Sequence, residues 1–194
     1  MNVEHGHLTT LNLLTTDTAP VGSRAILEST EAKLGMVPNL YAEMAHSPGL
    51  FGTYRLGYDS FRGDSGFDAT EQEIVLLAIS RFHVCTYCVA VHSVVADRNK
   101  VPVEFTDAIR SGKPIPDPKL QVLNAFTTAM LATRGRPSSF DLEQFVAAGY
   151  SEKKVLEIIL AIAVKTISNY TNHVFDTPLD AGFSHRAWTP TEAN

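Results

Sequence analysis

Residues 70–92 read TEQEIVLLAISRFHVCTYCVAVH, and this stretch decides both the fold and the candidate site. It holds the only two cysteines of the chain, Cys85 and Cys88, as a C-x-x-C pair. His92 follows Cys88 by one helical turn, and Glu73 lies twelve residues before Cys85. A dithiol, an imidazole and a carboxylate within so short a segment indicate a chemical site.

Two helices are predicted around this motif. Thr70 to Glu73 fit a capping box with Thr70 as the cap, and the segment 74–81 behind it is apolar on every side. That pattern predicts a buried helix. A second helix is predicted over 85–98, and its 3.6-residue period places both thiols and the imidazole on one face.

The rest of the chain also has helical patterns, with Ser, Pro and Gly at the expected starts and ends. The expected helices cover 23–34, 38–45, 48–61, 102–111, 120–133, 140–148 after Ser139, and 151 to about 175, where the last one is expected to break midway. No Asn-Gly or Asp-Gly pair lies between alternating segments, so no hairpin is predicted. The fold class is therefore predicted to be all-α.

The 194 residues suit one helical domain with its own core. The predicted division is an N-terminal arm over 1–21, a domain over 22–183 and a C-terminal tail over 184–194. Within the domain, a proline-rich connector over 113–118 separates a site half, to about 112, from a second half that begins at about 118.

A faint internal repeat relates the two halves. A shift of 81 residues places 70–80 on 151–161, each with a polar start and a buried run behind it. The same shift places His92 on His173, but the cysteines on Thr166 and Asn169. The second half is therefore expected to keep the helix pair without the thiols.

Composition limits the partners and the location. The formal net charge is -5 and no basic cluster occurs along the sequence, which argues against nucleic acid and anionic membranes as partners. The N-terminus has no secretory pattern, and the apolar runs at 74–79 and 155–164 are too short to span a bilayer. A cytoplasmic location is expected.

The spacing of the cysteines indicates redox chemistry or metal binding, because a bridge between them closes almost no loop and adds little stability. Cys85 lies at a helix start, where the helix dipole lowers the pKa of a thiol. His92 lies four residues after Cys88 and is expected to hydrogen-bond with it. The motif therefore supplies an attacking thiol, a resolving thiol and a proton acceptor.

Glu73 has two possible roles. As the third residue of a capping box it would serve the helix start. If the two helices pack antiparallel, however, Glu73 lies beside His92 and orients the imidazole.

Structural zinc is the alternative to redox chemistry, with Cys85, Cys88 and His92 as ligands and His83 or Glu73 as the fourth. Such sites usually bring two separated ligand pairs, so redox chemistry without a metal or cofactor is favoured. A thioredoxin-like fold is rejected because the chain offers almost no strands.

Glu73 followed by Cys85-x-x-Cys88-x-x-x-His92 resembles the alkylhydroperoxidase D branch of the carboxymuconolactone decarboxylase family. The likeness extends over most of the chain, from about 22 to 183. It includes GMVPNLYAEMAHSPGLF, AGYSEKKVLEIILAI and, typical of peroxidase-related members, NYTNHVFDTPLD.

The resemblance implies an all-helical homo-oligomer, a trimer or hexamer, with thiol-dependent peroxidase or disulfide reductase activity. A hydroperoxide would be the substrate, and a reductant protein or small thiol of unknown identity would regenerate the enzyme. Glu73, His92 and a water molecule would then activate Cys88, and Cys85 would close the disulfide. The helix dipole favours Cys85 as the attacking thiol, so the order of attack stays open.

Two features of the sequence limit which functions of the family can be expected here. Tyr87 stands where the best-studied branch has a second histidine, which leaves the reductant open. The decarboxylase branch of the family lacks the cysteine pair, so that activity remains only an alternative.

Overall fold

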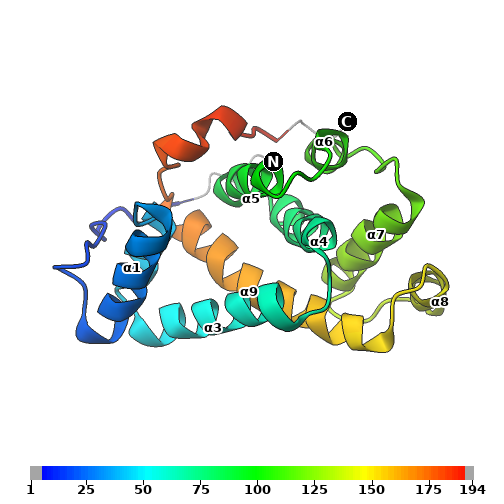
Figure 1. The fold of residues 1–194 in the computed structure, drawn as a ribbon, viewed down its shortest axis with the longest axis horizontal. Coiled ribbons are helices and arrows are strands. Elements are labelled where there is room, and N and C mark those ends of the chain that lie inside the picture. Colours follow the sequence, from blue (N-terminus) through cyan, green and yellow to red (C-terminus); the bar gives the residue numbers. More distant parts are fainter. Residues whose placement is uncertain (1–5, 191–194) are drawn as a thin grey trace.

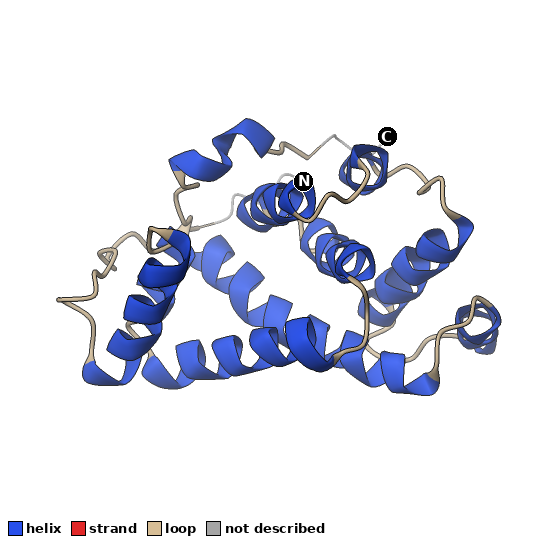
Figure 2. Cartoon of the chain, viewed as in Figure 1, coloured by secondary structure: helices blue, strands red, loops and turns tan. Residues whose placement is uncertain are grey.

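The protein is built of helices. The computed structural model describes residues 6–190, and within this range it contains no strand, which confirms the predicted all-α fold (Figures 1 and 2). The helices are α1 (Val21–Leu34), α2 (Asn39–Met44), α3 (Pro48–Asp64), α4 (Ala69–Phe82), α5 (Thr86–Arg98), α6 (Val103–Ser111), α7 (Pro118–Ala132), α8 (Ser139–Ala147) and α9 (Glu152–Phe175), followed by the 3-10 helix η1 (Ala181–Arg186). None of the helices in this range is both long and apolar enough to cross a bilayer.

Helix α4 is central, in contact with α5, α6, α7 and α9, and every residue from Glu71 to Ser80 is buried (Figure 1). Its cap is Asp68, whose carboxylate accepts a hydrogen bond from the Glu71 N–H at 2.8 Å. The predicted cap at Thr70 is wrong, because the reciprocal Asp68–Glu71 box begins two residues earlier. Glu73 consequently has no capping role and lies inside the helix.

A tight turn joins α4 to α5. The N–H of Cys85 donates to the Ser80 carbonyl and the N–H of Val84 donates to the Arg81 carbonyl, both at 2.9 Å, as in a Schellman motif. Val84 has a φ of 58°, a left-handed conformation that usually requires glycine. The turn reverses the chain, so α5 packs back along α4 and brings residues from the start of α4 beside the middle of α5.

Helix α9 runs without a break for 24 residues and packs against α2, α3, α4 and α5. The expected midway break, and with it the expected helix pair in the second half, is wrong. No glycine or proline lies between 152 and 175, so nothing in the sequence ends the helix. The internal repeat itself stays a prediction.

Helices α4 and α5 with the turn between them, residues 69–98, are called the α4–α5 corner below. Two hydrophobic cores pack against this corner. In the first, Phe126, Phe145 and Tyr150 stack with ring centroids 4.2 and 4.8 Å apart. The second surrounds both cysteines with residues of α1, α2, α3 and α9. The thiols therefore lie in packed apolar surroundings rather than on a loop.

Small differences at helix ends have simple causes. Helix α8 is capped by Ser138, one residue before the predicted Ser139, because Ser138 accepts from the Asp141 N–H at 3.1 Å. Pro118, expected in the connector, is the first residue of α7, a position that suits proline.

The described parts of both terminal segments pack on the domain. The N–H of Leu8 donates to the Val174 carbonyl at 2.7 Å. The expected irregular tail is wrong near residue 184, because η1 forms there, with Phe183 buried and Trp188 donating from Nε1 to the Arg110 carbonyl at 2.9 Å. Residues 1–5 of the predicted arm and 191–194 of the predicted tail lie outside the described residues.

Candidate active site

The two cysteines lie at the start of α5, both as free thiols. Cys85 is the N-cap residue and Cys88 lies in the first turn, with exposed fractions of 1% and 2%. Cys88 lines a cavity of about 1060 Å³, whereas Cys85 is not among the residues of 6–190 that line it. A molecule in the cavity therefore meets Cys88 first.

Glu73 and His92 form a buried pair across α4 and α5. His92 Nδ1 lies 3.1 Å from Glu73 Oε2, and both residues are at most 3% exposed. Glu73 Oε1 lies 2.6 Å from Arg62 Nη1 as an ion pair. Burial opposes ionisation of the carboxyl, but its hydrogen bond with His92 and the charge of Arg62 outweigh that effect and lower the pKa of Glu73.

The imidazole is neutral at physiological pH. Burial, and after it the charge of Lys165, lowers the pKa of His92 to about 4 despite the neighbouring carboxylate. Because ionised Glu73 only accepts hydrogen bonds, we assign the proton of neutral His92 to Nδ1. That tautomer leaves Nε2 as a proton acceptor, on a ring that lines the cavity.

Helix α9 contributes three polar side chains that sequence reasoning did not find. Asn172 Nδ2 donates to Cys88 Sγ at 3.2 Å and approaches Cys85 Sγ at 3.7 Å. Ser168 Oγ lies 3.9 Å from Cys88 Sγ, and Lys165, 1% exposed, faces the same cavity. The sequence does contain a signal for them: Lys165, Ser168 and Asn172 are polar residues spaced i, i+3 and i+7 on a helical face that is otherwise apolar.

These surroundings separate the pKa values of the two thiols. Burial opposes ionisation of Cys88, but the hydrogen bond from the Cys85 thiol and the charge of Lys165 outweigh it, so the pKa of Cys88 lies well below its usual range. The same thiol hydrogen bond, together with burial, raises the pKa of Cys85 far above its usual range. These surroundings therefore favour Cys88 as the more acidic thiol, whereas the helix dipole alone favours Cys85.

One predicted contact is missing. Between residues 6 and 190, no hydrogen bond joins the His92 ring to Cys88, although both side chains line the same cavity. The ring turns its Nδ1 to Glu73 instead. Proton exchange between ring and sulfur therefore requires an intermediary in the cavity.

The zinc alternative finds no support in the geometry. No group of three or more His, Cys, Asp or Glu side chains in the described part of the chain is placed to hold a metal ion. His83, the suggested fourth ligand, instead pairs through Nδ1 with Asn169 Oδ1 at 3.0 Å.

Tyr87, between the cysteines, borders the cavity and anchors the C-terminal segment. Its hydroxyl donates to Asp180 Oδ2 at 2.6 Å and accepts from the Leu40 N–H at 3.4 Å. The residue thereby ties the first turn of α5 to α2 and to the segment after α9.

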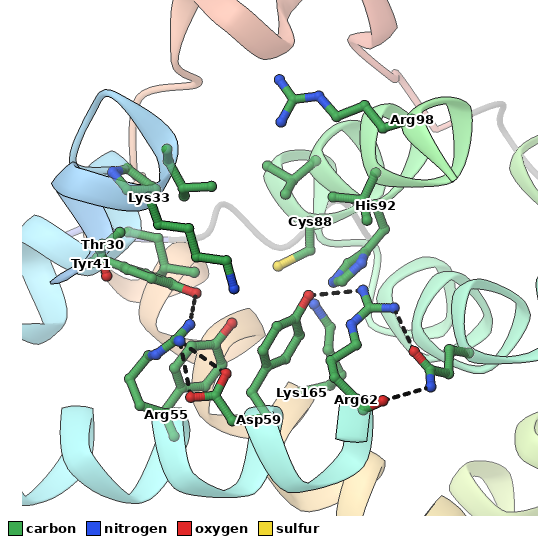
Figure 3. A pocket seen from close by; sticks show the side chains of 18 of the residues that line it. Thr30, Lys33, Tyr41, Arg55, Asp59, Arg62, Cys88, His92, Arg98 and Lys165 are labelled. Atoms are coloured by element: carbon green, nitrogen blue, oxygen red, sulfur yellow. Dashed lines mark hydrogen bonds and ion pairs between the residues drawn. The ribbon is translucent and has the colours of Figure 1, made fainter. Parts of the chain in front are cut away.

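The cavity lies between α1, α3 and α5, and Figure 3 shows Cys88 and His92 facing it from α5. Arg55, Asp59 and Arg62 form its opposite side on α3. Lys165 projects from α9 close to these groups in the same view. The site is thus a thiol next to an imidazole, within a pocket rich in aromatic and cationic side chains.

Comparison with known proteins defines the class of fold. No family model matches the chain, and no curated protein is similar to it in sequence. Solved structures do match over nearly the full length. They include helical proteins of the alkylhydroperoxidase AhpD core type and a debrominase with the same fold.

A peroxidase-related protein of this AhpD-core type from Ralstonia eutropha JMP134 superposes with a TM-score of 0.80 at 20% identity, covering 92% of this chain and 97% of that one. Another peroxidase-related protein, from Silicibacter sp. TM1040, gives 0.76 at 19% identity, with coverages of 94% and 97%. The debrominase Bmp8, in complex with 2,3,4-tribromopyrrole, gives 0.73 at 17% identity, with coverages of 92% and 97%. The chain therefore has the alkylhydroperoxidase D-like fold, which confirms the predicted resemblance at the level of fold.

Proposed function

We propose that this protein is a thiol-dependent peroxidase, or a closely related disulfide oxidoreductase. One observation carries the proposal: a thiol with a lowered pKa, Cys88, lines a cavity and is hydrogen-bonded to a second thiol, Cys85. Thiolates are the reactive form of cysteine toward peroxides and disulfides.

In the proposed reaction the Cys88 thiolate attacks the terminal oxygen of a hydroperoxide. The O–O bond breaks, an alkoxide leaves, and Cys88 becomes a sulfenic acid. Cys85 then attacks this sulfur, an S–S bond forms, and the hydroxyl group leaves as water with the Cys85 proton. One hydroperoxide and two thiols thus yield an alcohol, water and a disulfide.

Glu73 and His92 are proposed to move the protons. His92 Nε2 accepts the proton of Cys88 through a water molecule in the cavity and returns it to the leaving alkoxide. Glu73, 3.1 Å from Nδ1, orients the ring and stabilises the transient imidazolium. The ion pair with Arg62 holds Glu73 in place.

An external thiol or dithiol reductant must then reduce the disulfide, and its identity stays open. Assembly into a trimer or hexamer and a cytoplasmic location also stay predictions.

The test is a count of free thiols before and after addition of an organic hydroperoxide. Wild type is expected to lose both thiols per turnover, and His92→Gln is expected to lose them at least about a hundredfold more slowly. Retention of both thiols by the wild type would refute peroxidase activity. Turnover of a small carboxylic acid that survives alkylation of both cysteines would favour the decarboxylase alternative.

A further inference from the structure

The cavity beside Cys88 is much larger than hydrogen peroxide requires. Its volume of about 1060 Å³ matches pockets that enclose organic ligands, which span roughly 300–1,000 Å³. A substrate that fills it has an organic body in addition to the peroxide group.

One wall of the cavity is aromatic. The rings of Tyr41, Tyr54 and Tyr58 follow one another with centroid distances of 5.8 and 5.7 Å. Arg55 donates to the Tyr41 hydroxyl and Arg62 to the Tyr58 hydroxyl, both at 2.8 Å. With two hydroxyl groups engaged in this way, the wall offers mainly ring surface, which suits an aromatic or bulky apolar group.

The charged residues of the lining are mostly cationic, although the whole chain carries a net charge of -5. Among residues 6–190 the lining cations are Lys33, Arg55, Arg62, Arg98 and Lys165, and the only lining carboxylate is Asp59.

Three of these cations have negative partners. Arg55 pairs with Asp59 at 2.9 Å, Arg62 pairs with Glu73, and Lys165 faces the Cys88 thiolate.

Lys33 and Arg98 are the two that remain. Neither takes part in any of the ion pairs found within residues 6–190. Both lie in the last turn of a helix, where a cation complements the helix dipole. That role does not explain why cations from two separate helices border one cavity. In Figure 3, Lys33 reaches in from α1, and Arg98 lies on α5 beyond Cys88.

We propose that the substrate is an organic hydroperoxide with an aromatic or bulky apolar body that carries an anionic group such as a carboxylate. Lys33 and Arg98 would bind the anion, the tyrosine wall would hold the body, and the peroxide group would reach Cys88. The redox step is the one given above. This inference rests on the proposed function and names its substrate class.

The kinetic test compares cumene hydroperoxide with its para-carboxylated analogue. Wild type is expected to prefer the carboxylated substrate by about tenfold in kcat/KM at low salt, with a smaller preference at high salt. The double variant Lys33→Gln/Arg98→Gln is expected to lose this preference, so that its kcat/KM values for the two substrates become equal. The control Lys153→Gln/Arg136→Gln removes the same charge from exposed positions outside the cavity and should keep the preference.

Calorimetry with 4-isopropylbenzoate separates this inference from the proposed function, since the probe has no peroxide group. Binding to wild type that is weakened about tenfold in the double variant, but not in the control, supports the anion site even if neither hydroperoxide oxidises the thiols. Equal binding to wild type and double variant would overturn the inference. Equal turnover of the two hydroperoxides by the wild type would also overturn the inference about the anion site. In that case the peroxidase proposal would still stand.

Discussion

The α4–α5 corner and helix α9 contribute to the same site in different ways. The corner carries Glu73 and His92 together with both sulfurs, all within 20 residues of sequence. Helix α9 carries Lys165 and Asn172, about 80 residues away, and these groups help to decide which sulfur ionises. The comparison teaches that a motif supplies the reactive atoms, whereas their ionisation is a property of the tertiary structure.

The same contrast explains why the helix dipole alone favours Cys85 whereas the folded surroundings favour Cys88. A helix terminus favours an anion by roughly 0.3–1 kcal/mol, which is less than one pKa unit. A buried ammonium and a thiol hydrogen bond act on Cys88 at close range where solvent screening is weak. The nearby charge outweighs the local backbone field.

The largest expected effect concerns the sulfurs of the corner. Cys88→Ser should abolish reaction with hydroperoxide, because the attacking thiol is gone. Cys85→Ser should react once and stop at the sulfenic acid, because no second thiol can close the bridge. Stopped-flow oxidation with mass spectrometry of the product checks both. A single turnover by Cys88→Ser as fast as that of wild type would contradict the assignment.

Loss of the proton path should have the next largest effect. Glu73→Gln is expected to slow peroxide reduction roughly 10²–10⁴-fold, because it removes the carboxylate that orients the imidazole and stabilises the transient imidazolium. The pH profile of the rate should also change, which a purely structural loss would not cause. Circular dichroism checks that the variant, with Arg62 left unpaired, remains folded. An unchanged rate and profile would remove Glu73 from the mechanism.

Helix α9 can be tested through Lys165. Lys165→Met should raise the pKa of Cys88 and shift the pH dependence of its alkylation to higher pH by the same number of units. Lys153→Met, on the exposed start of the same helix, is the matched control. Iodoacetamide kinetics across pH in a Cys85→Ser background give the measurement. Equal profiles for Lys165→Met and the control would assign the low pKa to the corner alone.

Acid should destabilise the corner in a defined pH window. His92 has a folded pKa of about 4 against an ordinary value of 6.5, so the unfolded chain binds more protons between these values. The free energy of unfolding should therefore fall, by on the order of 3 kcal/mol from His92, as pH drops from 7 to 4. Urea unfolding at several pH values measures it. His92→Gln should reduce the slope in that window, and an unchanged slope would contradict the buried neutral imidazole.

The smallest expected effect lies in the turn. Val84 adopts a left-handed conformation that costs a β-branched residue roughly 1 kcal/mol or more. Val84→Gly relieves this strain and should change the free energy of unfolding by less than about 1 kcal/mol, since glycine gains chain entropy on unfolding. A loss of several kcal/mol would show that the valine side chain has a packing role.

Sequence reasoning predicted the parts of the molecule that depend on local pattern. The all-α class followed from helix starts and stops, and the meeting of Glu73 with His92 followed from an antiparallel helix pair. The cap at Asp68 was missed because Thr70 offers an equally good local pattern two residues later.

The missed groups of the site come together only through packing. Lys165 and Asn172 could be recognised as unusual polar residues on a buried face, but not assigned to Cys88 without the fold. The cationic lining of the cavity could not be predicted from the sequence either. Its charges come from α1, α3, α5 and α9, and no basic cluster occurs along the chain.

The most direct test of the account is a titration of each thiol alone. Thiolate absorbance is followed against pH in Cys85→Ser, where serine can still donate a hydrogen bond to Cys88, and in Cys88→Ser. Cys88 is expected to ionise well below the usual range of a cysteine, and Cys85 above it. The reverse order, or two ordinary titrations, would contradict it.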